Sequence, residues 1–481
     1  SNGCTTFEEL ENDPNRPGQV PPSMIFTKII QNIVYYPWSD EQRWNQFWCS
    51  NYAYYDDNEY DWTTTNYNFS ILNDVKQMVA EAERVGLPAN NPYSAIGKFF
   101  KAYFFVDMTM KVGDIPLLEA MSGLNNITPP YDAQKAVFQQ ALAWLEESND
   151  ELRGLINNLD KSLSGDFMLG NDLTKWQKVV NAYKLRVLIS LSKKESDNDL
   201  KINQAFNSVL SNPSKYPLMT SLNDNLTYRF NSSTEKYPLN PDNYGFTATR
   251  NNMSATYLNT LAALHDPRTF IVADPAPAKI AQGFTPDDFE AYAGANSGES
   301  LDDMSTKMLN GEYSPISKNK YYGSYLGEPT IQIGYVEQCF NIAEAINRGW
   351  ITGNAEEYYI IGIQASWTFH GADVSTNWAS YYSQDDVAYK GNNAQGLNQI
   401  ILQKYLGFFQ NSGWEAYYNY RRTGIPVFLT GPGTANSGRI PKRWQYPLSE
   451  RTANATNYEA ALQSQFEAVN DDINDEMWVI K

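Results

Sequence analysis

The sequence has very few of the side chains on which many catalytic and metal-binding sites depend. Only 2 His and 3 Cys occur among the 481 residues. No CxxC pair and no histidine at metal-binding spacing is present, so zinc and iron–sulfur centres are poorly supported. His265 precedes Asp-Pro-Arg and His370 precedes Gly371, contexts typical of a turn and a helix end, and we interpret both as structural. GxSxG, HExxH and P-loop motifs are also missing, so we predict no enzyme, no cofactor and no metal site.

Basic residues are scarce relative to acidic ones, and long apolar runs are absent. The chain carries 37 Lys and Arg against 55 Asp and Glu, a formal net charge of −18. Such a surface repels nucleic acids and anionic membrane faces, so we expect neither as a partner. No apolar run reaches 18 residues, so the sequence predicts no membrane-spanning helix.

Aromatic residues, in contrast, are abundant, with 33 Tyr and 12 Trp. A buried phenol needs a hydrogen-bond partner, so we expect some of these rings at the surface. Flat ring faces can stack on the apolar C–H faces of sugars, which favours a carbohydrate or peptide ligand over a small ion. The rings cluster in segments 38–62 and 321–325. The candidate ligand-binding residues are Trp38, Trp44, Trp48, Tyr54, Tyr55, Asp56, Asp57, Trp62, Tyr321, Tyr322 and Tyr325. Core packing is the competing interpretation, above all for Trp44, Trp48 and Trp62.

Neighbouring acidic residues leave two alternatives open. Pairs such as Asp56–Asp57 and Asp385–Asp386 could in principle contribute to a glycosidase, which needs two carboxyl groups about 5–9.5 Å apart. They could also bind calcium, although no EF-hand spacing supports this. Solvated loop acids are the simpler interpretation.

Hydrophobic periodicity predicts a mostly α-helical chain. Residues 94–112 form a strongly apolar segment that ends at Gly113, and apolar residues follow helical spacing in 176–191. Segments 336–350 and 355–369 form two amphipathic helices joined by a short turn, the unit of tetratricopeptide-like stacks, although no clean 34-residue repeat is visible. Residues 212–329 are rich in Pro, Gly, Asn and Ser, and we expect loops there with short elements at most.

The stretch EAYYNYRRTGIPVF, residues 415–428, combines rings with two adjacent arginines. Helical spacing places Tyr418, Arg421 and Arg422 on one face, and Gly424 followed by Pro426 is a helix stop signal. We interpret the stretch as a helix end whose guanidinium groups stack on rings, with a ligand clamp as the alternative.

An ordered set of segments carries a family resemblance. The set comprises FEELENDPNRP after Cys4, VDMTMKVGDIPLLEA, KWQKVVNAYKLRVLISLS, HDPR, VEQCFNIAEAINRGW and the C-terminal IILQKYLGFFQNSGWEAYYNYRRTGIPVF with RIPKRWQYPLSERTANATNYEAAL. Together they resemble SusD/RagB-type nutrient-binding outer-membrane lipoproteins, from residue 4 to about 462. No single motif is diagnostic, but the ordered set is specific. The resemblance implies stacked tetratricopeptide-like helix pairs, with the ligand site on loops.

The resemblance also sets expectations for organisation and partners. Residues 1–21 would form an extended tether with lipid on Cys4, and 22–481 a single SusD-like helical domain with a ligand-binding insert at about 212–329. The lipid would be the only membrane attachment, holding the protein on the extracellular side of the outer membrane. A SusC-like TonB-dependent transporter would receive the captured oligosaccharide, without catalysis.

Three alternatives to this function remain open from the sequence. The cargo could be a peptide, the protein could be an all-helical glycoside hydrolase, or the rings could face a protein partner. Whether Cys49 and Cys339 form a disulfide is also open at this stage.

Overall fold

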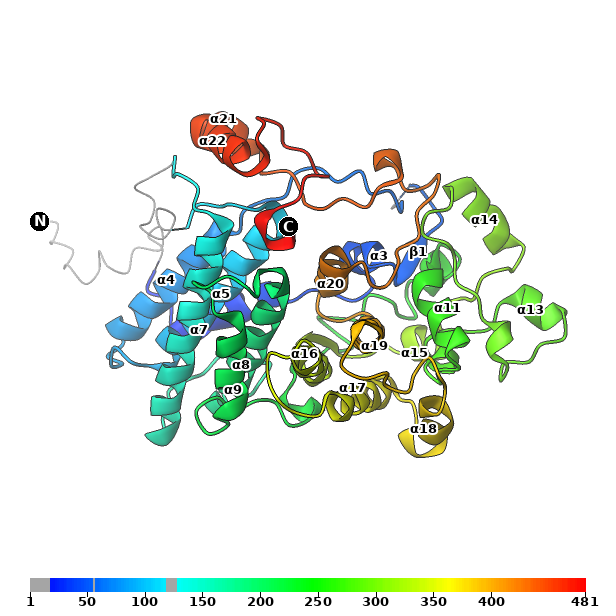
Figure 1. Cartoon of the computed structure of the whole chain (residues 1–481), viewed down its shortest axis with the longest axis horizontal. Helices are drawn as coiled ribbons and strands as arrows, with labels where there is room; N and C mark the ends of the chain where they lie inside the picture. Colours follow the sequence, from blue (N-terminus) through cyan, green and yellow to red (C-terminus); the bar gives the residue numbers. More distant parts are fainter. Residues whose placement is uncertain (1–17, 55–56, 118–127) are drawn as a thin grey trace, which may run out of the picture.

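The computed structural model describes residues 18–54, 57–117 and 128–481, and within them the chain is mostly α-helical, as predicted (Figure 1). One group of helices packs in sequence order, each against the next. It comprises α2 (Pro22–Ile33), α4 (Phe69–Arg84), α5 (Pro92–Val112), α7 (Gln134–Asn157), α8 (Leu173–Ser190) and α9 (Ile202–Ser211). A second group packs on α8 through its first member, and consists of α16 (Tyr335–Asn347), α17 (Ala355–His370) and α19 (Ala394–Gly407). The expected stack of helix pairs is therefore confirmed.

Helix α5 shows why the apolar segment 94–112 forms a central helix. The Asn91 side chain caps its first turn by accepting a hydrogen bond from Ser94 N at 3.0 Å, and Pro92 is compatible with the first helical position. Gly113, with φ +107°, ends it. Apolar residues surround most of the helix because α4 and α7 both pack against it.

The hairpin of α16 and α17 depends on one glycine. A Cβ atom at Gly362 would lie 2.8 Å from Cζ of Phe340, a ring that is fully buried. The absence of a side chain at position 362 therefore lets the two helices approach closely.

Buried ion pairs join α16 to α20 (Glu415–Thr423) and to α8. Arg422 contacts Glu344 of α16 through two hydrogen bonds of 2.6 and 3.0 Å, and Arg186 of α8 contacts Glu337 at 2.6 Å. Burial alone would raise the pKa of Glu344, but the guanidinium of Arg422 outweighs it and lowers this pKa to about 2.

The neighbouring Arg421 has a different role. Its guanidinium lies 4.7 Å from the ring centroid of Tyr418 and donates to Lys442 O at 3.0 Å. Both arginines of the 415–428 stretch are thus part of the scaffold, and Gly424 adopts the left-handed conformation that ends the helix.

Residues 212–329 contain short elements, of which α11, α13, α14 and α15 lie on the right in Figure 1. They are β2 (Leu226–Tyr228), α10 (Tyr244–Thr247), β3 (Asn251–Met253), α11 (Ala255–Ala263), α12 (Thr269–Val272), α13 (Pro277–Ala281), α14 (Leu301–Leu309) and α15 (Lys318–Tyr322). Two antiparallel pairs attach this segment to the rest of the chain: β1 (Trp48–Ser50) pairs with β3, and β2 pairs with β4 (Thr330–Ile333). The remaining helices are α3 (Asp40–Trp44), α18 (Val374–Tyr382), α21 (Leu448–Ala453) and α22 (Ala455–Phe466).

The two described cysteines do not form a disulfide. Cys49 lies on β1 and Cys339 on α16, and both are buried free thiols. Burial raises the pKa of the Cys49 thiol to about 11, so it is protonated and unreactive at neutral pH. None of the helices that the structure describes has the length and apolar character needed to cross a bilayer.

Candidate functional site

A hollow of about 400 Å³ opens beside the β1–β3 pair. The segment that follows the first helix contributes one set of lining residues, Trp38, Trp48, Ser50 and Tyr52. The irregular segment 212–329 contributes the other set, Pro238, Leu239, Phe246, Thr247, Arg250 and Asn251. The strand register places Ser50 opposite Asn251, so these two regions, about 200 residues apart in sequence, meet at one site.

The inner part of the hollow is a rigid aromatic floor. The indole Nε1 of Trp38 donates to the Tyr237 hydroxyl at 2.8 Å, and that of Trp48 donates to Ser39 O at 3.0 Å. The Trp38 ring also packs edge-on against Tyr321, with 5.0 Å between centroids. Because the polar atoms of both indoles are satisfied, each tryptophan offers mainly apolar ring surface to the hollow.

The outer edge carries exposed rings. Tyr52 is 42% exposed, Phe246 is 59% exposed, and Tyr54, next to Tyr52, is 79% exposed. The Arg250 guanidinium lies 4.3 Å from the ring centroid of Tyr52 and 5.4 Å from that of Phe246. This arginine therefore holds two rings from different segments in one wall, through cation–π contacts.

Two of the predicted tryptophans lie elsewhere. Trp62 stacks on Trp444 with 4.0 Å between centroids and 7° between planes, and Trp44 packs against Trp62 at 5.5 Å. Trp44 Nε1 donates to Glu59 O at 3.0 Å. Together with Trp414 these rings form a packed aromatic cluster, and neither Trp44 nor Trp62 lines the hollow.

The three tyrosines of segment 321–325 do not form the surface patch that we expected. Tyr321 is completely buried behind Trp38, because its ring completes the packing of the floor. Tyr322 is also buried, and its hydroxyl lies 2.6 Å from the hydroxyl of Thr247, which lines the hollow. Tyr325 is half-buried and donates to Asp242 at 2.7 Å. Tyr321 and Tyr322 thus support the hollow from behind.

Of the two acidic candidates, the structure describes Asp57 but not Asp56. Asp57 lies with Glu59 and Asp61 in a group whose carboxylate oxygens are within 4.8 Å of one another. Partial burial, with the nearby negative charge of Asp57, raises the pKa of Glu59. Tyr55, Asp56 and Cys4 lie outside the described residues.

Phe246, Thr247 and Arg250 were not among the sequence candidates. Their stretch, YGFTATRNNM, has neither a clear period nor an unusual density of rings. Its only signal was its position in a loop-rich segment. Pairing of β3 with β1, a long-range contact, is what brings these residues beside Trp48 and Tyr52.

A family model described as "Starch-binding associating with outer membrane", SusD-like, matches residues 14–447. The chain belongs to the SusD-like family. Two SusD homologues of Bacteroides fragilis support this assignment. One is 30% identical, with 96% of this chain and 100% of that chain covered and a TM-score of 0.85; the other is 32% identical, with 96% and 99% covered and a TM-score of 0.82.

A chitin-binding SusD homologue from Flavobacterium johnsoniae has the same fold at 18% identity, with 96% of this chain and 98% of that chain covered and a TM-score of 0.74. At that identity the likeness to this SusD-like chain concerns the fold alone. Among curated proteins, none matches the chain.

Proposed function

We propose that this SusD-like protein captures an oligosaccharide in the hollow between β1 and α10 and hands it unchanged to a SusC-like TonB-dependent transporter. One observation carries the proposal: two segments distant in sequence combine to form a hollow with tryptophan rings inside and exposed Tyr52 and Phe246 at its edge. The starch-binding description of the family and the chitin-binding neighbour both fit a glycan cargo.

The arrangement suits a chain of sugar rings. Stacking on Tyr52 and Phe246 demands little precise orientation, so successive sugar units can contribute affinity along the edge. Polar groups of Ser50, Thr247 and Asn251 line the same hollow and can bond hydroxyl groups, which fixes orientation. Its volume of about 400 Å³ admits part of an oligosaccharide, and the remainder would extend over the exposed rings.

The lining supports binding rather than hydrolysis. Among the described residues that line the hollow, none carries a carboxyl group, whereas a glycosidase needs two flanking the scissile bond. The cargo would therefore leave the site chemically unchanged.

Attachment through lipid on Cys4, at the extracellular side of the outer membrane, belongs to the same proposal. The family description associates its members with the outer membrane. Lipid on an N-terminal tether would leave the helical body free to approach the transporter.

Isothermal titration calorimetry with a panel of α- and β-linked glucans, chitin oligosaccharides and peptides tests the cargo class. We expect at least one glycan to bind at micromolar to millimolar concentration and the peptides to give no heat. Binding of peptides with no response to any glycan would overturn the proposal.

A further inference from the structure

We propose that a second hollow, between α2, α5 and residues 65–68, binds a neutral mono- or disaccharide through the side chains of Asp107 and Lys111. This hollow has a volume of about 340 Å³, at the low end of the range for small-molecule sites. Its lining includes Tyr35, Asn66, Tyr67, Asn68, Asp107 and Lys111. None of these residues lines the first hollow.

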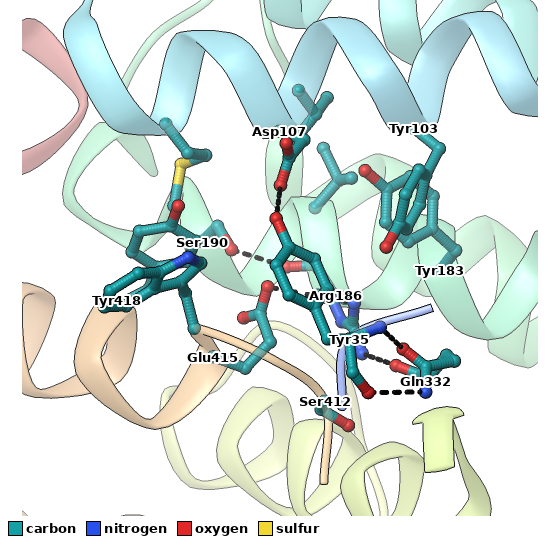
Figure 2. A pocket seen from close by; sticks show the side chains of 14 residues that line it. Tyr35, Tyr103, Asp107, Tyr183, Arg186, Ser190, Gln332, Ser412, Glu415 and Tyr418 are labelled. Atoms are coloured by element: carbon teal, nitrogen blue, oxygen red, sulfur yellow. Dashed lines mark hydrogen bonds and ion pairs between the residues drawn. The ribbon is translucent and has the colours of Figure 1, made fainter. Parts of the chain in front are cut away.

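The floor of this second hollow is preorganised around Tyr35. Gln332 holds the backbone of Tyr35 on both sides, accepting from its N–H at 2.8 Å and donating to its C=O at 3.1 Å. The Tyr35 hydroxyl donates to Asp107 Oδ1 at 2.6 Å, and Figure 2 shows it pointing at this carboxylate. The position of the Asp107 carboxylate is therefore fixed before any ligand arrives, which lowers the entropy cost of binding.

The Asp107–Lys111 pair retains capacity for a ligand. Lys111 Nζ donates to Asp107 Oδ2 and to the Tyr35 hydroxyl, both at 3.2 Å, and an ammonium group has three N–H donors. The carboxylate accepts one hydrogen bond at each oxygen and can accept more. Both side chains are partly exposed. One charged acceptor and one charged donor therefore lie side by side at the bottom of the hollow.

This chemistry selects a neutral ligand with several hydroxyl groups. The charges of Asp107 and Lys111 cancel, so the floor attracts neither anions nor cations strongly. A hydroxyl group both donates and accepts, so adjacent hydroxyls on one sugar can bond to the carboxylate and to the ammonium. Hydrogen bonds to charged groups are about twice as strong as those between neutral groups.

The walls offer matching neutral groups. Asn66 and Asn68 line the hollow, and neither side chain makes a hydrogen bond to any residue that the structure describes. Their amides donate and accept as sugar hydroxyls do, and the half-buried ring of Tyr67 supplies apolar surface.

The depth of the hollow limits ligand size. Behind Tyr35, Tyr103 and Asp107 lies an inner cavity of only about 30 Å³, lined also by Arg186 and Glu415 (Figure 2). Such a space holds water but not a sugar ring. A ligand would therefore stop at the floor, and the hollow suits one or two sugar units rather than a long chain.

Saturation-transfer difference NMR with glucose, galactose, N-acetylglucosamine, maltose and chitobiose tests this inference. Asn66→Trp places a large ring at an exposed position and fills the hollow, and Lys111→Met removes the ammonium while keeping the apolar stem. We expect at least one saccharide to give a signal with the wild-type protein that Asn66→Trp abolishes and for which Lys111→Met weakens affinity about tenfold or more. A saccharide that binds only in the first hollow would keep its signal in both variants.

Phe246→Ala is the matched control in the first hollow, and it should leave this signal intact. The inference is overturned if no neutral saccharide gives a signal, if every signal persists in both variants of the second hollow, or if only Phe246→Ala removes the signals. Glycan capture in the first hollow and saccharide binding in the second are tested independently of each other. Asn66→Trp should retain oligosaccharide binding in the first hollow, and loss of glycan capture there would leave the result for the second hollow unaffected.

Discussion

Trp38 and Tyr237, 199 positions apart in the chain, are joined by a 2.8 Å hydrogen bond from the indole Nε1 to the phenol oxygen. The bond connects the segment after the first helix to the irregular segment 212–329, beneath the first hollow. Tyr237 also stacks on Tyr321, with 6.1 Å between centroids and 15° between planes. This contact makes the floor of the hollow one packed unit, although its parts come from two distant segments of the sequence.

Replacing Tyr237 by Phe should lower the free energy of unfolding by about 1–3 kcal/mol, because the buried Trp38 Nε1 then lacks an acceptor. Urea unfolding followed by tryptophan fluorescence measures this change. Tyr325→Phe is the matched control, since its hydroxyl bonds Asp242 at the surface, and it should cost less than about 0.5 kcal/mol. Equal effects of the two substitutions would show that the buried bond does not stabilise the floor.

Replacing Phe246 by Ala should weaken glycan binding roughly tenfold, because one stacking face at the edge of the first hollow is lost. Calorimetry with the best glycan of the panel gives the dissociation constants. Phe167→Ala removes a comparably exposed ring that does not line the hollow, and it should leave affinity unchanged. Unchanged affinity in Phe246→Ala would place the glycan elsewhere.

Breaking the buried pair between Arg422 and Glu344 should destabilise the fold strongly. Arg422→Met leaves the Glu344 carboxylate buried with Arg348 as its remaining ion-pair partner. We expect the free energy of unfolding to fall by about 3–5 kcal/mol. Thermal unfolding monitored by circular dichroism measures the loss. Lys28→Met, which removes an exposed ion pair with Asp74, should cost less than about 1 kcal/mol. A loss of similar size in both variants would contradict a special role for the buried pair.

The pKa of Glu344 gives this stabilisation a defined pH dependence. Its folded pKa of about 2 lies below the ordinary value of 4.5, so the unfolded state binds more protons between these pH values. Its contribution is thus fully present above about pH 4.5 and is lost as the pH falls toward 2, by an amount on the order of 3 kcal/mol. Urea unfolding at a series of pH values measures the slope. Glu344→Gln should flatten the profile in this window, and an unchanged slope would exclude Glu344 as its source.

Replacing Gly362 by Ala should destabilise the protein, although alanine is the better helix former by about 1 kcal/mol. The new Cβ would lie 2.8 Å from the buried ring of Phe340, and overpacking of this kind costs about 1–3 kcal/mol. Gly154 lies inside α7 with no atom closer than 3.9 Å to its Cβ position, so Gly154→Ala should stabilise by about 1 kcal/mol. Opposite signs for the two variants, measured by urea unfolding, confirm the packing argument, and equal signs contradict it.

The sequence by itself determined the features that depend on the local pattern of residues. Apolar composition, apolar periodicity and stop signals located the helices: the predicted 94–112 and 355–369 became Pro92–Val112 and Ala355–His370. The same reasoning identified Arg421 and Arg422 as scaffold, because their spacing and Gly424 describe a helix end. These features depend on residues a few positions apart, which a sequence displays directly.

Only the tertiary structure decided which rings face solvent. Tyr321 and Tyr54 have equally polar sequence surroundings, yet the first is fully buried and the second is 79% exposed. The difference comes from long-range contacts, the β1–β3 pair and the bond from Trp38 to Tyr237, which bury some rings and leave Tyr52 and Phe246 at an edge. Burial depends on which distant segments pack together, and the 2.0 and 3.6 residue periods of strands and helices carry no information about that.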